Sequence, residues 1–403
     1  SIEHIANQYQ EPAFDYVAWE NSEYLPTPTI VEAAQALYRG HNVHDITRSD
    51  AGAENLTVTT DEINRIIEHS KAKGRKSICF VTGVPGAGKT LVGLNIAIQR
   101  SDAQKGEHAV FLSGNFPLVS VLQEALARDK VEQEKQRGGS ISKKDALRST
   151  SAFIQIIHKY RDSFVGNQNV PPDRVAIFDE AQRAWTQDMI AKFMSTKKGV
   201  PDFSYSEPEF LISTMDRHKD WAVVICLVGG GQEINTGEAG ISEWIHALND
   251  KFPHWKVYIS PKLTEPEYAE GKVNELLAKN ENVTYSENLH LGVSLRSFRA
   301  EKLSAFVHSM LTFNPDAAEL YNEIKDRYPI VLTRDMETAK RWLHSKVRGT
   351  ERTGVLVTKE AARFKPLGIH ILPSGDENAV HWFLEDKIDT RASNYLEDAA
   401  TEI

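Results

Sequence analysis

One run of eight residues constrains the fold of this chain more than any other: Gly83-Val84-Pro85-Gly86-Ala87-Gly88-Lys89-Thr90. It fills every fixed position of the pattern G-x-x-x-x-G-K-[ST], the Walker A motif or P-loop. The apolar run at 77–82 before it predicts a buried strand, and the apolar spacing at 91–98 after it predicts a helix. A strand, a glycine loop and a helix in this order form a phosphate cradle, because loop N–H groups turn inward and the helix N-terminus adds its positive dipole end.

The last two residues of the motif have separate predicted roles. The Lys89 ammonium is expected to reach the β and γ phosphates of a nucleoside triphosphate, and the Thr90 hydroxyl is expected to ligate Mg²⁺. ATP and Mg²⁺ are therefore the predicted cofactors, held by the whole loop from Gly83 to Thr90. The alternative, a glycine-rich turn with a solvent-exposed lysine, explains neither the preceding strand nor the Lys-Thr pair.

Composition narrows the class of protein. With 403 residues and 41% hydrophobic content the chain can bury a full core, and its length favours two or three domains. A formal net charge of −9 argues against a chain coated in basic residues for indiscriminate nucleic-acid binding. Cys79 and Cys226 both lie in apolar runs, which indicates buried thiols and no disulfide framework or zinc site.

The chain carries no signal for a membrane. Its longest apolar run, 222–228, is far shorter than the roughly 20 residues that cross a bilayer, and no secretion signal opens the chain. A cytoplasmic location with no membrane partner is therefore predicted. Because the chain begins with Ser1 and ends at Ile403 without an obvious stop signal, we expect it to be a piece of a longer protein.

Apolar runs and amphipathic segments alternate after the P-loop, as in a parallel α/β sheet. Strands are predicted at 108–115, 174–180 and 222–228, and helices at 117–128, 151–160, 187–194 and 207–218. The highly charged segment 129–144 is interpreted as an exposed excursion, a solvated surface in preference to a lid or a nucleic-acid contact.

The region before the P-loop has fewer signals. Residues 1–55 are interpreted as an N-terminal arm or the remnant of an upstream domain, with one predicted helix at 29–38. At Thr59 the pattern T-x-x-E, completed by Glu62, predicts a capping box that begins the helix leading to the P-loop strand.

Acidic residues follow the strand predicted at 174–180, at the edge where ligands of open α/β sheets collect. We assign Asp179 to the metal and Glu180 to the base that takes a proton from the attacking water, as in a Walker B motif. An Asp-Glu pair alone is weak evidence, because acidic dipeptides often cap helices. Together with an intact P-loop, the pair indicates hydrolysis and not binding alone.

Two later segments supply candidate catalytic residues. Glycines at 229–231 permit close backbone approach and could place the Gln232 amide beside the γ phosphate; the alternative is a loop glutamine without a role. An arginine from a second domain stabilises charge in phosphoryl transfer, and Arg296 is the candidate, with Arg299 in reserve.

In this order, the motifs resemble those of superfamily 1 helicases and, more closely, bacterial helicase-like ATPases related to the helicase domain of Schlafen proteins. The residues that carry the resemblance are 83–90, 111–115, 179–182, 229–235, 237–240 and 294–297. The resemblance implies a P-loop RecA-like domain at 56–290 and a second RecA-like domain at 291–403, with ATP between them. Strands are predicted in the second domain near 330–332 and 354–357, and the domain is expected to be incomplete. It gives functional roles to Lys89, Thr90, Asp179, Glu180, Gln182, Gln232 and Arg296.

Some positions depart from the family pattern. Where such helicases read adenine with a glutamine, this chain has Glu62 and Asn64, so the preference for ATP over GTP is open. Gly230 stands where many relatives have an acidic residue, which weakens the link between hydrolysis and strand movement. The last motif is expected beyond Ile403, and Arg391 is interpreted as a decoy for it.

Two functions remain open on these residues. The first is ATP hydrolysis coupled to binding and translocation on, or remodelling of, single-stranded DNA or RNA. The second is a nucleotide-gated switch that controls a protein partner or fused effector domain, in defence against foreign nucleic acid, without unwinding. Asn115 and Phe116 are candidate strand contacts, although a helix-start role for Phe116 and core packing for Trp185 are the favoured interpretations.

Overall fold

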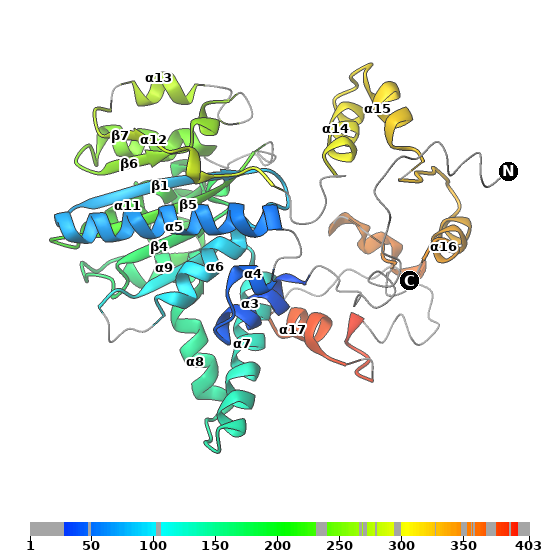
Figure 1. The fold of residues 1–403 in the computed structure, drawn as a ribbon, viewed down its shortest axis with the longest axis horizontal. Coiled ribbons are helices and arrows are strands. Elements are labelled where there is room, and N and C mark those ends of the chain that lie inside the picture. Colours follow the sequence, from blue (N-terminus) through cyan, green and yellow to red (C-terminus); the bar gives the residue numbers. More distant parts are fainter. Residues whose placement is uncertain are drawn as a thin grey trace, which may run out of the picture.

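An eight-stranded parallel sheet forms the centre of the computed structural model (Figure 1). The strands are β1 (Lys76–Gly83), β2 (Ala109–Ser113), β3 (Ile154–Ile156), β4 (Val175–Asp179), β5 (Ala222–Gly229), β6 (Lys256–Ile259), β7 (Val283–Tyr285) and β8 (His290–Leu291). Their order is β3-β2-β4-β5-β1-β6-β7, and β8 pairs with β1. The predicted α/β fold with a RecA-like parallel sheet domain is confirmed.

The structure describes residues 28–46, 50–101, 106–230, 240–265, 268, 272–278, 280–293, 300–326, 328–347, 353–355, 357, 359–367, 376–386 and 388–393. The α-helices before residue 293 are α3 (Ile30–Tyr38), α4 (Val43–Ile46), α5 (Asp50–Lys73), α6 (Lys89–Gln99), α7 (Phe116–Gln136), α8 (Lys143–Phe153), α9 (Ile157–Phe164), α10 (Gln187–Phe193), α11 (Glu207–Asp216), α12 (Gly240–Asp250) and α13 (Val273–Leu277). No helix within these described ranges is both long and apolar enough to cross a bilayer.

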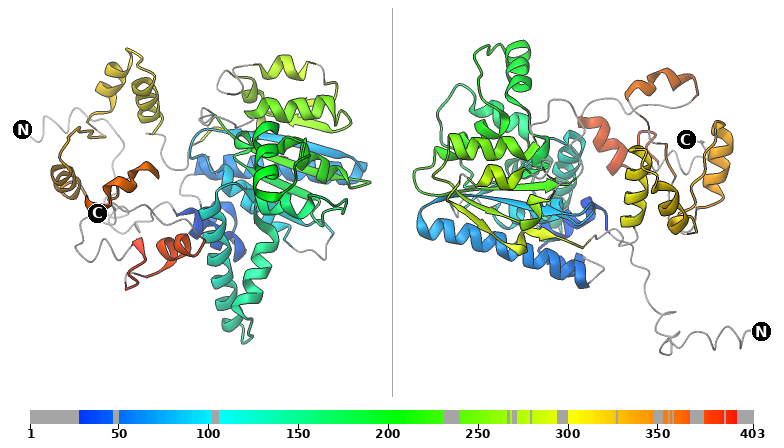
Figure 2. Two further views of the ribbon diagram at one scale, coloured as in Figure 1. Left: turned by 180° about the vertical axis from the view of Figure 1, so that it is seen from behind. Right: turned by 90° about the horizontal axis from the view of Figure 1, so that it is seen from above.

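Helices cover both faces of the sheet, as Figure 2 shows from two sides. Alternate residues of β1 enter the two cores, Ile78 and Phe80 on one face and Cys79 and Val81 on the other. The first face packs against α9, α10, α11, α12 and α13, and the second against α3, α4, α5, α6 and α7. Strands buried on both faces are apolar throughout, which is why the central strands could be predicted.

Helix α5 begins earlier than predicted. It spans 24 residues from Asp50, so the capping box expected at Thr59 is wrong and the expected boundary at 55/56 falls inside a helix. Thr59 and Thr60 are buried, on the same stripe as Leu56 and Ile63. Two polar residues within the buried stripe interrupt the apolar pattern that would have revealed the full helix.

The same capping pattern does begin a helix at α3, two helices before α5. Thr29 caps α3, where its side chain accepts from the Glu32 backbone N–H, and the Glu32 carboxylate accepts from the Thr29 backbone N–H at 2.7 Å. The helix predicted at 29–38 is therefore confirmed, and its apolar side belongs to the second core.

The charged segment at 129–144 is an excursion, as predicted, but a helical one. Helix α7 runs to Gln136 and α8 starts at Lys143, so the two form a hairpin that projects from the sheet (Figure 1). The single helix predicted at 151–160 is wrong, because residues 154–156 pair with β2 as strand β3 and separate α8 from α9.

Within the described residues after 293 the regular elements are helices: α14 (Ala300–Leu311), α15 (Ala317–Ile324), α16 (Met336–His344) and α17 (Asp376–Leu384), with a 3-10 segment at Lys359–Leu367. The strand predicted near 330–332 is wrong, since this apolar run is irregular and Leu332 is fully exposed. Residues 353–355 and 357, where another strand was predicted, are also irregular. A strand needs a hydrogen-bonded neighbour, and within the described residues neither segment pairs with a strand.

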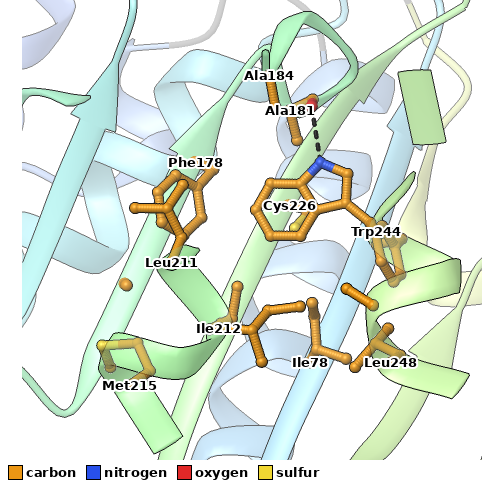
Figure 3. Close-up of a cluster of buried hydrophobic side chains, with 14 of the residues drawn as sticks. Ile78, Phe178, Ala181, Ala184, Leu211, Ile212, Met215, Cys226, Trp244 and Leu248 are labelled. Carbon is orange, nitrogen blue, oxygen red and sulfur yellow. Dashed lines mark hydrogen bonds between the residues drawn. The ribbon is translucent and has the colours of Figure 1, made fainter. Parts of the chain in front are cut away.

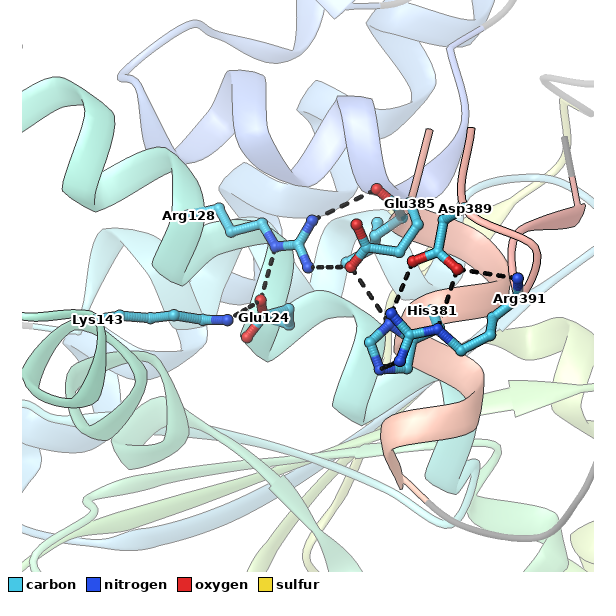
Figure 4. Close-up of polar contacts among 8 residues, drawn as sticks. Glu124, Arg128, Lys143, His381, Glu385, Asp389 and Arg391 are labelled. Atoms are coloured by element: carbon cyan, nitrogen blue, oxygen red, sulfur yellow. Dashed lines mark hydrogen bonds and ion pairs between the residues drawn. The ribbon is translucent and has the colours of Figure 1, made fainter. Parts of the chain in front are cut away.

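The last helix contacts the sheet domain through ion pairs, drawn in Figure 4. The Arg128 guanidinium on α7 lies 2.7 Å from the Glu385 carboxylate just after α17, and 2.6 Å from Glu124. Lys143, at the start of α8, also contacts Glu124, at 2.7 Å. The C-terminal helix is thus attached to α7 of the hairpin.

Trp244 on α12 connects the first core to the loop after β4, as Figure 3 shows. Its ring is fully buried and lies 5.4 Å from the Phe178 ring, centroid to centroid. Its indole N–H donates to the Ala181 carbonyl at 2.9 Å. The side chain therefore fixes the backbone that follows the strand carrying Asp179.

We predict that Trp244→Phe lowers the free energy of unfolding by about 2 kcal/mol, because it opens a small cavity and leaves the Ala181 carbonyl with only the longer hydrogen bond from the Ala184 N–H, at 3.3 Å. Chemical denaturation followed by circular dichroism measures the change. Trp342→Phe on α16 is the matched control, and equal losses in the two variants would contradict the role assigned to Trp244.

Candidate functional site

The P-loop lies between β1 and α6, as predicted. Gly86 and Gly88 have φ angles of 76° and 90°, in the left-handed region that glycine adopts without strain. Gly88 precedes α6 and offers no side chain to cap it, so the first N–H groups of this helix remain available to an anion. The loop therefore has the backbone form of a phosphate cradle.

The Lys89 side chain folds back into this loop. Its ammonium donates to the Gly83 carbonyl at 2.8 Å and lies 3.4 Å from the Val84 carbonyl oxygen. Burial lowers the pKa of Lys89, and the charges of Glu180 and Asp179 oppose that shift. A phosphate entering the loop would offer the ammonium a charged partner in place of two neutral carbonyls.

Thr90 and Asp179 lie side by side, although 89 positions separate them in the sequence. The Thr90 hydroxyl donates to the Asp179 carboxylate at 3.1 Å. Burial raises the pKa of Asp179 to about 7, the charge of Glu180 adds to the rise, and hydrogen bonds from Thr90 and Ser113 oppose it. A cation at this carboxylate would favour its ionised form.

The pair suits Mg²⁺, which binds hydroxyl and carboxylate oxygens and takes its remaining ligands from water and substrate phosphates. Among the described residues no group of three or more His, Cys, Asp or Glu side chains could hold a metal. Thr90 and Asp179 would hold a metal jointly with nucleotide oxygens, and the roles assigned to them from the sequence stay predictions.

Glu180 is in a strained backbone conformation at the end of β4. Its φ and ψ angles are 55° and 49°, which side chains other than glycine rarely adopt. The chain turns there into a short 3-10 segment, Ala181–Arg183. Strain of this kind, worth about 1 to 3 kcal/mol, collects at functional sites.

Gln182 is fully buried and bridges two strand ends. Its amide N–H donates to the Glu180 carboxylate at 2.6 Å, and its amide oxygen accepts from the Gly229 N–H at 3.1 Å. Because Gly229 ends β5, this side chain fixes Glu180 relative to the neighbouring strand. The sequence motif drew attention to Gln182 without indicating these contacts.

Two predicted catalytic residues, Gln232 and Arg296, lie outside the described residues, as does the reserve candidate Arg299. Their roles stay predictions. Gly230, the position that departs from the family pattern, is the last described residue after β5.

The other positions that depart from the family pattern are engaged elsewhere. Glu62 accepts hydrogen bonds from Arg65 and Ser286, and Asn64 accepts one from Arg100. Arg391, interpreted as a decoy, pairs with Asp389 beside α17 at 2.7 Å (Figure 4).

A cavity of about 380 Å³ lies beside Asp179 and Glu180. Its lining comes from the ends of β2 and β4, the start of α9, and α12: Ser113, Gly114, Asn115, Ile157, His158, Phe178, Asp179, Glu180, Ala181, Arg183, Ala184, Trp185, Glu207 and Trp244. Residues 83–90 do not line it, so it is distinct from the phosphate cradle.

The residues considered as contacts to a nucleic-acid strand, Asn115, Phe116 and Trp185, lie at or near this cavity. The Asn115 side chain caps α7 by accepting from the Leu118 N–H at 3.2 Å, and Phe116 packs against the second core at the helix start. Trp185 packs against the first core, with its ring centroid 4.6 Å from that of His158. These contacts agree with the packing roles favoured from the sequence for Phe116 and Trp185.

A family model described as Schlafen group 3, DNA/RNA helicase domain matches residues 76–402. The match begins at β1, so α3, α4 and α5 precede it. No curated protein matches the chain.

We predict that Asp179→Asn stabilises the nucleotide-free protein in a pH-dependent way. The folded protein keeps a proton on Asp179 up to about pH 7, whereas the unfolded chain releases it near pH 4, so this carboxyl stabilises the fold less as pH rises between those values. The gain from Asp179→Asn in unfolding free energy should grow by about 2 to 3 kcal/mol between pH 5 and pH 8.

Denaturant titrations without nucleotide or Mg²⁺, at several pH values, measure this gain. The control variant is Asp202→Asn, at an exposed position away from the site. A gain from Asp179→Asn that stays constant across pH would contradict the prediction.

Proposed function

The chain belongs to the Schlafen group 3 family of DNA/RNA helicase domains, and on that premise we propose that it is an Mg²⁺-dependent ATPase. The proposal includes coupling of hydrolysis to movement along, or remodelling of, single-stranded DNA or RNA. One observation carries it: Lys89, Thr90 and the Asp179-Glu180 pair meet at one edge of the sheet although the chain separates them by about ninety positions.

Binding begins at the P-loop in this proposal. Backbone N–H groups of Gly86, Gly88 and the start of α6 would surround the triphosphate, and Lys89 would leave the carbonyls of Gly83 and Val84 to pair with the β and γ phosphates. Thr90 and Asp179 are the residues that would hold Mg²⁺. A Mg²⁺ ion held by these two residues would supply positive charge that offsets the negative charge developing on the phosphate oxygens.

Glu180 is the proposed general base. It follows Asp179, the proposed metal ligand, at a left-handed turn of the backbone. The Gln182 amide N–H donates to one oxygen of the Glu180 carboxylate and so restrains it. A base held in this way can accept the proton of the attacking water without first losing side-chain freedom. Gln182 thereby acts on the reaction through Glu180, as a positioning residue.

The remaining catalytic groups belong to the proposal by sequence alone. Gln232 would orient the attacking water, and Arg296 would contact the γ phosphate when the two parts of the chain close on ATP. The rival function is a nucleotide-gated switch that does not move on nucleic acid. It uses the same phosphate site, and single-stranded DNA or RNA would not stimulate its ATP hydrolysis.

We predict that two substitutions separate binding from hydrolysis. Lys89→Ala should weaken ATP binding about 100-fold, because charge-assisted hydrogen bonds to phosphate are lost. Glu180→Gln should keep ATP binding and lower kcat by about 100- to 10,000-fold, because the amide accepts no proton. Lys130→Ala and Glu132→Gln, both on α7, are matched controls.

Fluorescent-nucleotide titration and phosphate release measure the two quantities. Normal turnover in Glu180→Gln would remove Glu180 from the role of base, and unchanged binding in Lys89→Ala would remove the P-loop from the role of triphosphate site.

We predict that single-stranded DNA or RNA stimulates ATP hydrolysis, and that stimulation falls as salt rises from about 50 to 200 mM, because phosphate contacts release counterions. Steady-state phosphate release with and without poly-dT and poly-U, at both salt concentrations, tests this. Hydrolysis that neither strand stimulates would favour the nucleotide-gated switch.

A further inference from the structure

The chain leaves the sheet domain through residues 286–293, here called the linker segment, which precedes α14. Strand β8 within it pairs with the end of β1, with Thr82 opposite His290 and Gly83 opposite Leu291. The Val84 N–H donates to the Leu291 carbonyl at 3.0 Å. The linker segment is therefore hydrogen-bonded to the beginning of the P-loop.

Gly83 permits this close approach. A Cβ atom added at Gly83 would lie 2.9 Å from the Leu291 Cβ and 3.1 Å from the Leu291 carbonyl oxygen. A side chain at position 83 would displace the linker backbone. The first glycine of the motif thus serves the contact with the linker segment as well as the loop.

One peptide group joins Lys89 to the linker segment. The carbonyl of the Gly83–Val84 peptide accepts from the Lys89 ammonium at 2.8 Å, and the N–H of the same peptide donates to Leu291 at 3.0 Å. Hydrogen bonds in such a chain polarise one another, so each bond strengthens the next. If Lys89 turns to a phosphate, the Gly83 carbonyl loses this donor, and the hydrogen bond from the Val84 N–H to the Leu291 carbonyl would weaken.

Asn55 of α5 holds the linker segment on both sides of Leu291. Its amide N–H donates to the His290 carbonyl at 3.3 Å, and its amide oxygen accepts from the Val293 N–H at 3.2 Å. The linker segment is further attached to α5 by Ser286, whose hydroxyl donates to Glu62 at 2.7 Å. Its side chains Leu289 and Leu291 are buried in the second core, which α5 shares.

We propose that Asn55 is a positioning residue that couples the nucleotide state of the P-loop to the linker segment. The proposal rests on the proposed ATPase function. Asn55 holds the backbone on both sides of Leu291, which keeps the Leu291 carbonyl within hydrogen-bond distance of the Val84 N–H. A change in the position of Lys89 therefore changes the conformation of the linker segment. Arg296, the proposed phosphate-contacting arginine, follows Val293 by three positions. Asn55 precedes the matched residues 76–402, so the inference gives a role to α5, a helix outside the match.

The test uses three variants of the whole chain. Asn55→Leu keeps side-chain size and removes both hydrogen bonds. Asn55→Asp keeps the acceptor for the Val293 N–H and loses the donor to His290. Asn64→Leu is the matched control, because Asn64 lies on the same helix and contacts Arg100 instead of the linker segment. The measurements are ATP affinity by fluorescent-nucleotide titration, kcat with saturating ATP, and amide hydrogen exchange of peptides covering 286–293 with and without ATP.

Asn55→Leu should bind ATP within about threefold of the unmodified chain, lower kcat about 10-fold or more, and abolish the effect of ATP on exchange in residues 286–293. Asn55→Asp should fall between Asn55→Leu and the unmodified chain, and Asn64→Leu should match the unmodified chain. Unchanged kcat and an unchanged exchange response in Asn55→Leu would overturn the inference, as would equal losses in Asn64→Leu, which would indicate a general contribution of α5 to stability.

The outcomes also separate this inference from the proposed function. If the chain binds ATP without hydrolysing it, the exchange measurement still decides whether Asn55 couples the two segments. ATP binding with no exchange response in the unmodified chain overturns the coupling alone. Absence of ATP binding overturns the coupling and the proposed function together.

Discussion

The parallel pairing of β1 with β5 is the interaction on which the geometry of the site depends. The two strands are in register over eight pairs, from Lys76 opposite Ala222 to Gly83 opposite Gly229, so they end at the same level of the sheet. Strand β4 pairs with β5 on its other side and ends at Asp179. The start of the P-loop, the end of β5 and the acidic pair therefore share one edge, and the buried Gln182 can connect Glu180 to Gly229 across it.

The elements that could be predicted are those with a local sequence signal. Strands β1, β4 and β5 are buried on both faces, so each is an apolar run bounded by turn residues. Strand β3 is three residues long and joins two helices, which leaves no period to detect. The first turns of α5 were missed because Thr59 and Thr60 occupy buried positions on its apolar stripe, where a polar residue resembles a helix start.

The candidate site divides in the same way. Lys89, Thr90, Asp179 and Glu180 lie in short motifs whose chemistry can be recognised from spacing alone, and the structure brings Thr90 and Asp179 into contact. Asn55 contacts the backbone of a residue 235 positions away, and neither its type nor its neighbours indicates this. A polar side chain that bonds to backbone groups across the fold depends on tertiary packing, so a single sequence contains no pattern for it.

The strained and buried groups at this edge share one physical explanation. Asp179 is a buried carboxyl beside a second carboxylate, Lys89 is a half-buried ammonium held by neutral carbonyls, and Glu180 has a left-handed backbone. Each lowers the stability of the nucleotide-free fold, and the core behind them, including Trp244 and Gln182, holds them in place. A triphosphate with Mg²⁺ would supply an anion to the Lys89 ammonium and a cation to the Asp179 carboxylate, so each group would gain a partner of opposite charge. Lys89 must release the Gly83 carbonyl to reach a phosphate, and the N–H of the same peptide is bonded to the linker segment. Nucleotide binding would therefore change a hydrogen bond at the point where the chain leaves the sheet for the helices that follow.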